Sequence, residues 1–180
     1  IVVGLMDFVF IWMPGYRLMG SNTDRSRYYV GELNGKSSKQ AYMDALHISE
    51  SNIINQTFHN PLGKMNGQDI CIISLKEVSG NGLCCYRQVN DSDVLVLLEE
   101  QDYNEILDET LQRIRRDFNH ISGVFSINCV FRYLLFSQEH HMEDYLKSMS
   151  TLGEHAGLIG FGEHYNQQFG NQTMTCVVFE

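Results

Sequence analysis

The stretch DYNEILDETLQRIRRDFNHISGVFSINCVFRY, residues 102–133, decides the class of the fold. In its first half the apolar residues recur every three or four positions, which is typical of one helix face packed on a core. They are Leu107, Leu111, Ile114 and Phe118. The sequence therefore predicts a helix over 102–118. Residues 122–133 are apolar and rich in β-branched and aromatic side chains, so their first part is predicted to be a buried strand.

On either side of this predicted helix and strand, further strands and helices are expected to alternate irregularly along the chain. We expect helices over 39–47 and 139–152, and strands over 1–12, 28–33, 69–78, 83–89, 93–98, 157–161 and 172–179. The turn dipeptide Asn34-Gly35 and the run Ser79-Gly80-Asn81-Gly82 indicate hairpins. This order predicts an α+β fold with a mixed, mainly antiparallel sheet and helices packed mainly on one face.

The composition excludes two classes of partner. The 180 residues carry a net charge of −9 with histidine neutral, whereas nucleic acids and anionic membranes attract proteins with a surplus of Lys and Arg. The apolar start of the chain is interrupted by Asp7 and stopped by Pro14-Gly15, so it is too short to span a bilayer. We expect no nucleic-acid partner and no membrane insertion. Because the chain opens directly in an apolar strand, we also expect it to be a fragment of a longer protein.

The five cysteines and the histidines do not form a recognisable metal or redox motif. The cysteine count is odd and no CxxC spacing is present, which favours free thiols in a reducing compartment, and hence a cytoplasmic protein. His140 and His141 are adjacent and point in different directions, and no HxxxH or HxH pair exists. No Gly-rich nucleotide-binding turn is present either. We therefore expect no metal, no cofactor and no catalytic residue.

The first candidate site residues are Cys129 and Arg132, at or near the end of the buried strand. Strand ends are where side chains leave the core and meet ligands. Arg132 suits a ligand carboxylate because its guanidinium donates two parallel hydrogen bonds. Two alternatives stay open: a small core cysteine beside a structural ion-pair arginine, or a thiol nucleophile activated by the neighbouring charge. The second alternative also needs a base, and no spacing in the sequence provides one.

Two further segments carry candidate binding groups. Glu163 follows Gly162 at the end of a predicted strand, where glycine allows close approach of a ligand and the carboxylate is able to accept from an ammonium group. Asn171 and Thr173 stand at the start of the last strand, where they are suited to line a pocket mouth. The alternatives are a solvated turn glutamate for the first segment, and turn chemistry with β-propensity for the second.

Six segments in order together resemble one family, the C-terminal FIST domain (F-box and intracellular signal transduction). They cover about 150 residues from residue 28 to the end, and they are ELNGKSSKQAYMDAL (32–46), HNPLG (59–63), GNGLCCYRQV (80–89), FSINCVFR (125–132), GLIGFGE (157–163) and NQTMTCVVF (171–179). The chain departs from the family pattern at Phe131, where a small residue is usual. It also departs at Leu158 and Gly160, where the family often has Phe and Thr.

The resemblance implies a FIST C-like domain over 28–180, preceded at 1–27 by a lead-in strand or the end of a FIST N-like region. It further implies a non-enzymatic sensory domain of an intracellular signalling protein that binds a small ligand such as an amino acid. The implied partners are a FIST N domain in the full-length protein and a downstream signalling domain.

Charge complementarity adds an assignment that the resemblance does not provide. We infer that Arg132 takes the carboxylate of the ligand and Glu163 its ammonium, with Asn171, Thr173 and the backbone near Gly162 completing a polar shell. The alternative function is a protein-interaction scaffold without a small-molecule pocket, which predicts a large exposed apolar patch.

Overall fold

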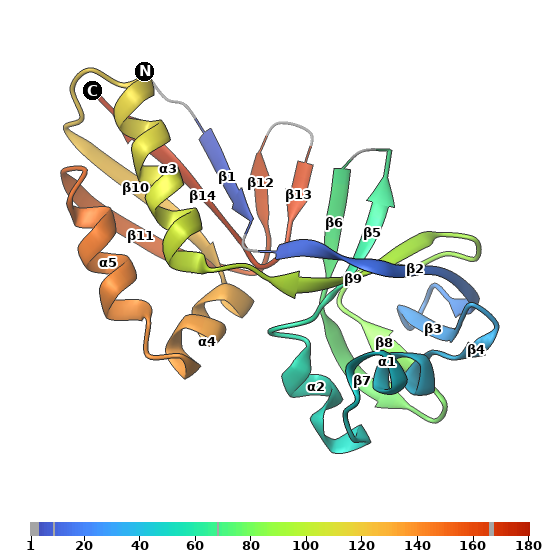
Figure 1. Ribbon diagram of the computed structural model, residues 1–180. Helices are drawn as coiled ribbons and strands as arrows, with labels where there is room; N and C mark the ends of the chain where they lie inside the picture. Colours follow the sequence, from blue (N-terminus) through green and yellow to red (C-terminus); the bar gives the residue numbers. More distant parts are fainter. Residues whose placement is uncertain (1–3, 9, 68, 166–167) are drawn as a thin grey trace. The chain divides into compact units, whose positions relative to one another are not determined.

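The computed structural model describes residues 4–8, 10–67, 69–165 and 168–180, and these divide into two compact units (Figure 1). Unit 1 combines Ile1–Val9 with Gln101–Glu180, and unit 2 is the continuous stretch Phe10–Glu100. The units are described separately below. No helix in the described part of the chain has the length and apolar character needed to cross a bilayer.

The strands of unit 2 form one antiparallel sheet. Their order across the sheet is β6-β5-β9-β2-β3-β8-β7, with β4 paired to β3. The bounds are β2 (Phe10–Asp24), β3 (Tyr29–Leu33), β4 (Lys36–Ser37), β5 (Leu62–Asn66), β6 (Asp69–Ile73), β7 (Leu75–Ser79), β8 (Gly82–Cys85) and β9 (Val94–Glu100). Asn34 and Gly35 both have positive φ, 53° and 73°, as a two-residue hairpin between β3 and β4 requires.

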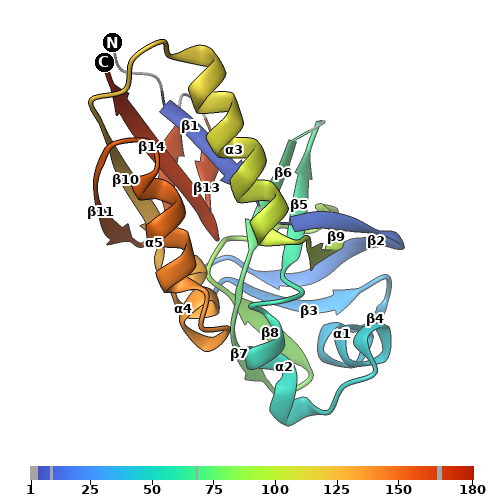
Figure 2. The same ribbon diagram turned by 60° about the vertical axis from the view of Figure 1, so that its left-hand side comes forward.

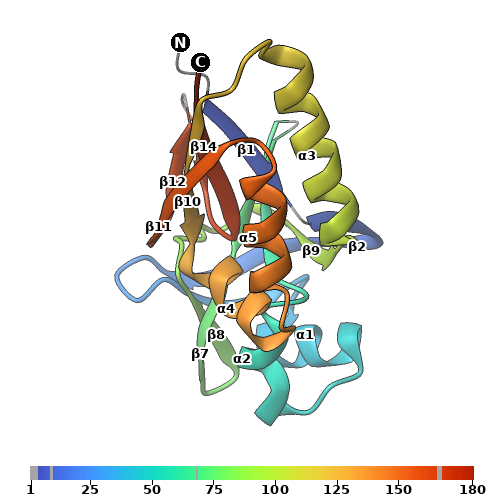
Figure 3. The same ribbon diagram turned by 90° about the vertical axis from the view of Figure 1, so that its left-hand side faces the viewer.

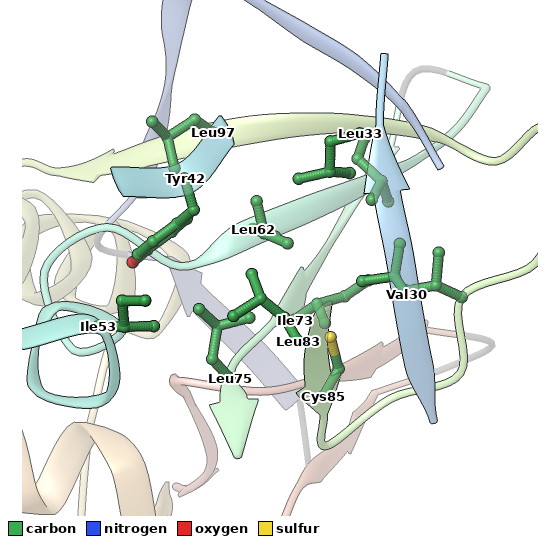
Figure 4. Packing of buried hydrophobic residues seen from close by; sticks show 12 residues of the cluster. Val30, Leu33, Tyr42, Ile53, Leu62, Ile73, Leu75, Leu83, Cys85 and Leu97 are labelled. Carbon is green, nitrogen blue, oxygen red and sulfur yellow. The ribbon is translucent and has the colours of Figure 1, made fainter. Parts of the chain in front are cut away.

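Short helices complete unit 2 and close its core. They are α1 (Ser38–Leu46), the 3-10 helix η1 (Glu50–Asn52) and α2 (Ile53–Gln56). The hydroxyl of Ser37 caps α1 by accepting from the backbone N–H of Gln40. The sheet and helices enclose a cluster of buried side chains that includes Val30, Leu33, Tyr42 and Leu62 (Figure 4). Unit 2 therefore has a hydrophobic core of its own.

The main sheet of unit 1 has the order β1-β14-β10-β11. The strands are β1 (Gly4–Phe8), β10 (Gly123–Cys129), β11 (Glu154–Gly160) and β14 (Thr173–Phe179), and β12 (Glu163–Tyr165) with β13 (Gln168–Gly170) forms a separate hairpin. β14 runs antiparallel to both β1 and β10, whereas β10 and β11 are parallel.

The helices of unit 1 are α3 (Tyr103–Asp117), α4 (Val130–Gln138) and α5 (Met142–Ser150), and they lie on one side of this sheet (Figures 2 and 3). Asp102 caps α3 by accepting from the backbone N–H groups of Asn104 and Glu105. The predicted stripe of α3 is buried, as its position against the sheet requires.

The structure confirms the α+β class, the mainly antiparallel pairing and the long helix after Asp102. The strand predicted from Ser122 ends at Cys129, and the helix α4 that follows it was not predicted as a helix. The helix predicted over 139–152 is shorter at both ends, since α5 begins at Met142 and ends at Ser150. The strand predicted over 1–12 falls partly on residues 1–3 and 9, which lie outside the described residues.

Candidate functional site

All six predicted binding residues belong to unit 1. Cys129 is the last residue of β10, Arg132 is in the first turn of α4, and Thr173 is the first residue of β14. Glu163 is the first residue of β12, directly after Gly162, and Asn171 stands two residues before β14. Apart from the half-buried Gly162, these residues are buried: Arg132 is 1 % exposed and Glu163 is 2 % exposed.

Arg132 is placed by the change from strand to helix at Cys129. The strand alternates between the two faces of the sheet up to this residue, and α4 then begins at Val130. The guanidinium carbon of Arg132 lies 4.8 Å from the ring centroid of Phe136, one turn further along the helix. It lies 6.0 Å from the ring centroid of Tyr145 in α5. Aromatic faces thus hold a buried cation next to the end of β10.

Glu163 is the acidic counterpart of this cation. Its Oε2 accepts a 2.7 Å hydrogen bond from the hydroxyl of Thr173, and its Oε1 has no hydrogen-bond partner among the described residues. Burial raises the pKa of Glu163 to about 7, although Thr173, the backbone N–H of Gly162 and the charge of Arg132 each act to lower it. A carboxyl with this pKa changes its charge near neutral pH.

The backbone around Glu163 uses glycine in two different ways. Gly162 has a φ of 135°, a region that residues with a Cβ rarely adopt, so the turn into β12 needs glycine there. A Cβ at Gly160 would come 3.5 Å from Oε1 of Glu163 and 3.2 Å from Cγ2 of Ile127, so a small side chain fits there only if Ile127 shifts slightly. A side-chain hydroxyl at residue 160 would therefore be close enough to reach this unpartnered oxygen.

Cys129 is not arranged as an activated nucleophile. Burial and the charge of Glu163 raise the pKa of its thiol, and the backbone N–H groups of Gln172, Phe131 and Arg132 oppose this rise only in part. The thiol is also 1 % exposed. Because an activated cysteine needs a lowered pKa and access to its substrate, the structure favours a small buried side chain here.

A chain of buried hydrogen bonds on the helix side of β10 was missed in the sequence. Asn128 donates through Nδ2 to the hydroxyl of Tyr145 at 2.8 Å, and that hydroxyl donates to Oγ of Ser126 at 3.2 Å. Ser126 Oγ also lies 2.9 Å from Nε2 of His155. Oδ1 of Asn128 has no hydrogen-bond partner among the described residues. The sequence feature that could have indicated these hydrogen bonds is the pair of polar residues at alternate positions of a buried strand, Ser126 and Asn128.

The described residues of the site do not gather the side chains that a metal ion needs. No three side chains of His, Cys, Asp and Glu lie together there in a way that would hold a metal ion. The charged groups of the site are one guanidinium and one carboxyl, which suit a ligand with both an anionic and a cationic group.

In a comparison with protein-family models, the model of the FIST C domain matches residues 39–166. The chain belongs to the FIST C domain family. It is thus a sensory-type domain of the signal-transduction class, from a family that is not known for catalysis. The FIST C match includes Cys129, Arg132, Gly162 and Glu163 but ends before Asn171 and Thr173. Comparisons with curated proteins and with solved structures find no match.

Proposed function

We propose that this FIST C domain senses a small ligand of the amino-acid type, without catalysis, at the Arg132–Glu163 site. The observation that carries the proposal is a buried guanidinium whose charge acts on a buried carboxyl, one oxygen of which has no hydrogen-bond partner among the described residues. Leaving a buried polar atom without a hydrogen bond costs about 1–3 kcal/mol. A ligand that donates to this oxygen would remove that cost.

The chemical assignment follows from charge. Arg132 would bind the ligand carboxylate, and Oε1 of Glu163 would accept from the ligand ammonium. Thr173 already orients the carboxyl of Glu163, while Asn171, Cys129 and the backbone near Gly162 would complete the polar shell. An ammonium beside Glu163 favours the ionised carboxylate, so binding would release a proton from a group whose pKa is about 7. Affinity should therefore rise between about pH 6 and pH 8.

The closed state of the site suits a sensor. Because Arg132 and Glu163 are both shielded from water, a ligand would enter only through a conformation that opens the segment around Gly162. A ligand that binds one of two conformations shifts their populations, and such a shift is a signal that a partner domain can read. We propose that a FIST N-like region and a signalling domain are those partners, in the cytoplasm, where the five free cysteines would stay reduced.

The test is a thermal-shift screen of the chain against the twenty amino acids. The variants are Arg132→Met, which keeps most of the buried volume, and Glu163→Gln, with Arg113→Met on the exposed surface of α3 as the matched control. Ligand at about 100 times Kd stabilises a protein by about 2.7 kcal/mol. We expect one amino acid to raise the melting temperature of the wild type and of the control, but not of the two site variants.

A second function, protein-interaction scaffold, is supported by the exposed apolar residues around β11. This strand pairs only with β10 among the described strands, so its other edge has no partner in them. Leu158 is 49 % exposed, Ile159 43 % and Phe161 90 %. No stabilisation by any amino acid would contradict the sensory proposal and favour this alternative, in which an extended segment of a partner adds to the edge.

A further inference from the structure

Unit 2 contains a cleft that lies outside the Arg132–Glu163 site. It has a volume of about 370 Å³ and opens between β2, the β3–β4 turn and helix α1. Sites for small molecules occupy about 300–1,000 Å³ and combine apolar walls with a few polar groups. Every residue that lines the cleft belongs to unit 2.

The floor of the cleft is apolar. Leu33 is fully buried beneath it, and Leu18 of β2 lies beside it. Ala41 and Ala45 face it from α1, one helical turn apart. Their small side chains keep the helix from filling the space, so a larger residue at either position would close the cleft.

The walls are held in place by hydrogen bonds. Asn34 fixes its turn to β2, because Oδ1 accepts from the backbone N–H of Met19 at 2.7 Å and Nδ2 donates to the carbonyl of Arg17 at 3.2 Å. On the other side, the hydroxyl of Tyr16 donates to the carbonyl of Ala45 at 3.3 Å. A cleft held in this way is largely formed before a ligand arrives, which lowers the entropy cost of binding.

Two cations at the mouth of the cleft give it a chemical preference. Arg17 and Lys36 are exposed, and neither forms an ion pair with a carboxylate in the described part of the chain. The one acid in the lining, Asp44, stands on α1 and accepts from Nε2 of Gln40 at 2.7 Å. An acidic group is therefore favoured at the Arg17 and Lys36 end and disfavoured near Asp44.

We propose that this cleft binds a small amphipathic carboxylate. The carboxylate group would lie between Arg17 and Lys36, and a short hydrocarbon tail would cover Leu18, Leu33 and the two alanines. Guanidinium and ammonium groups both donate to carboxylates through charge-assisted hydrogen bonds. The tail gains from leaving water, at about 0.8 kcal/mol per buried CH₂. The site is independent of the amino-acid proposal because it shares no residue with it.

The experiment is a titration of the ¹⁵N-labelled 180-residue chain with octanoate, followed by amide chemical shifts. We expect the largest changes over residues 15–18, 33–36 and 41–45. Replacing both cations, Arg17→Gln with Lys36→Gln, should weaken binding roughly tenfold, because each exposed charge pair contributes modestly. The matched control, Arg25→Gln with Lys76→Gln, removes the same charge from exposed positions outside the cleft and should leave the affinity unchanged.

A second variant and a second probe separate specific binding from general adsorption. Ala45→Leu fills the cleft without altering charge and should abolish the octanoate shifts, while dispersed spectra show that the chain is folded. Octylamine has the same tail with the opposite charge and should bind much more weakly. The proposal is overturned if octanoate at about 10 mM shifts no amide of the cleft. Equal affinity of the cation variant and the wild type, or of octanoate and octylamine, overturns it as well.

Discussion

Replacing Glu163 by glutamine should stabilise the protein above neutral pH. The folded state raises the pKa of this carboxyl from about 4.5 to about 7, because burial disfavours its charge. Its contribution to stability is fully present below about pH 4.5 and is lost as the pH rises through 7. At 1.36 kcal/mol for each pKa unit, the loss by pH 8 is up to about 3 kcal/mol. Glutamine has no charge to bury and still accepts from Thr173, so it should avoid this loss.

The assay is differential scanning calorimetry at about pH 5 and about pH 8. Glu163→Gln and the wild type should melt at similar temperatures at the lower pH. At the higher pH the variant should melt about 5–10 °C above the wild type. Glu109→Gln, on the exposed face of α3, removes the same charge and serves as the control. If the difference between Glu163→Gln and the wild type is the same at both pH values, the buried carboxyl does not titrate as argued.

Three further outcomes are expected around the same carboxyl. Thr173→Val removes the hydroxyl that donates to Glu163, and should lower the free energy of unfolding by about 1.5–3 kcal/mol at pH 8 but by less at pH 5, where the carboxyl is neutral. If urea unfolding shows the same loss at both pH values, the acceptor is not charged at pH 8. Gly160→Ser places a hydroxyl near Oε1 of Glu163, and should be about 1 kcal/mol more stable than Gly160→Ala in the same assay. A serine variant less stable than the alanine variant would mean that the hydroxyl does not reach this oxygen. Cys129 should react with iodoacetamide more slowly in the folded chain than in urea, since burial raises the pKa of its thiol and shields it; faster labelling of the folded chain, measured by mass spectrometry, would revive the thiol-enzyme alternative.

The sequence predicts a helix or strand correctly where the pattern that marks it lies wholly within its own residues. The apolar residues of α3 recur at helical spacing, and Asp102 is an N-cap residue directly before the helix. Both the presence of α3 and its first residue could therefore be predicted from the sequence. The run after Ser122 misled because an apolar segment fits a buried strand and a buried helix equally well. The change from strand to helix at Val130 depends on the packing of α4 against β10. The spacing of apolar residues along the sequence does not reveal that packing.

The candidate site could be predicted in part for the same reason. Arg132 and Glu163 were named from their charges and their places near strand ends, but the effect of one charge on the other depends on α4 and β12, which are far apart in the sequence. The chain from Asn128 through Tyr145 to His155 was missed because its hydrogen bonds join three elements. The division into two units was also invisible, since no linker of distinct composition separates them and the chain passes from unit 1 to unit 2 and back between successive strands and helices.

The pairing of β1 with β14 has a consequence for how the chain is made. β1 is synthesised before unit 2, yet its partner β14, with Val177 opposite Gly4, is synthesised after unit 2. Unit 2 is continuous and is complete once residue 100 has emerged, so it is able to fold while synthesis goes on. Unit 1 must wait until β14 has emerged, and must then close a loop that contains the whole of unit 2. A nascent chain that has not yet reached β14 would therefore carry a folded unit 2 while β1 still lacks its strand partner.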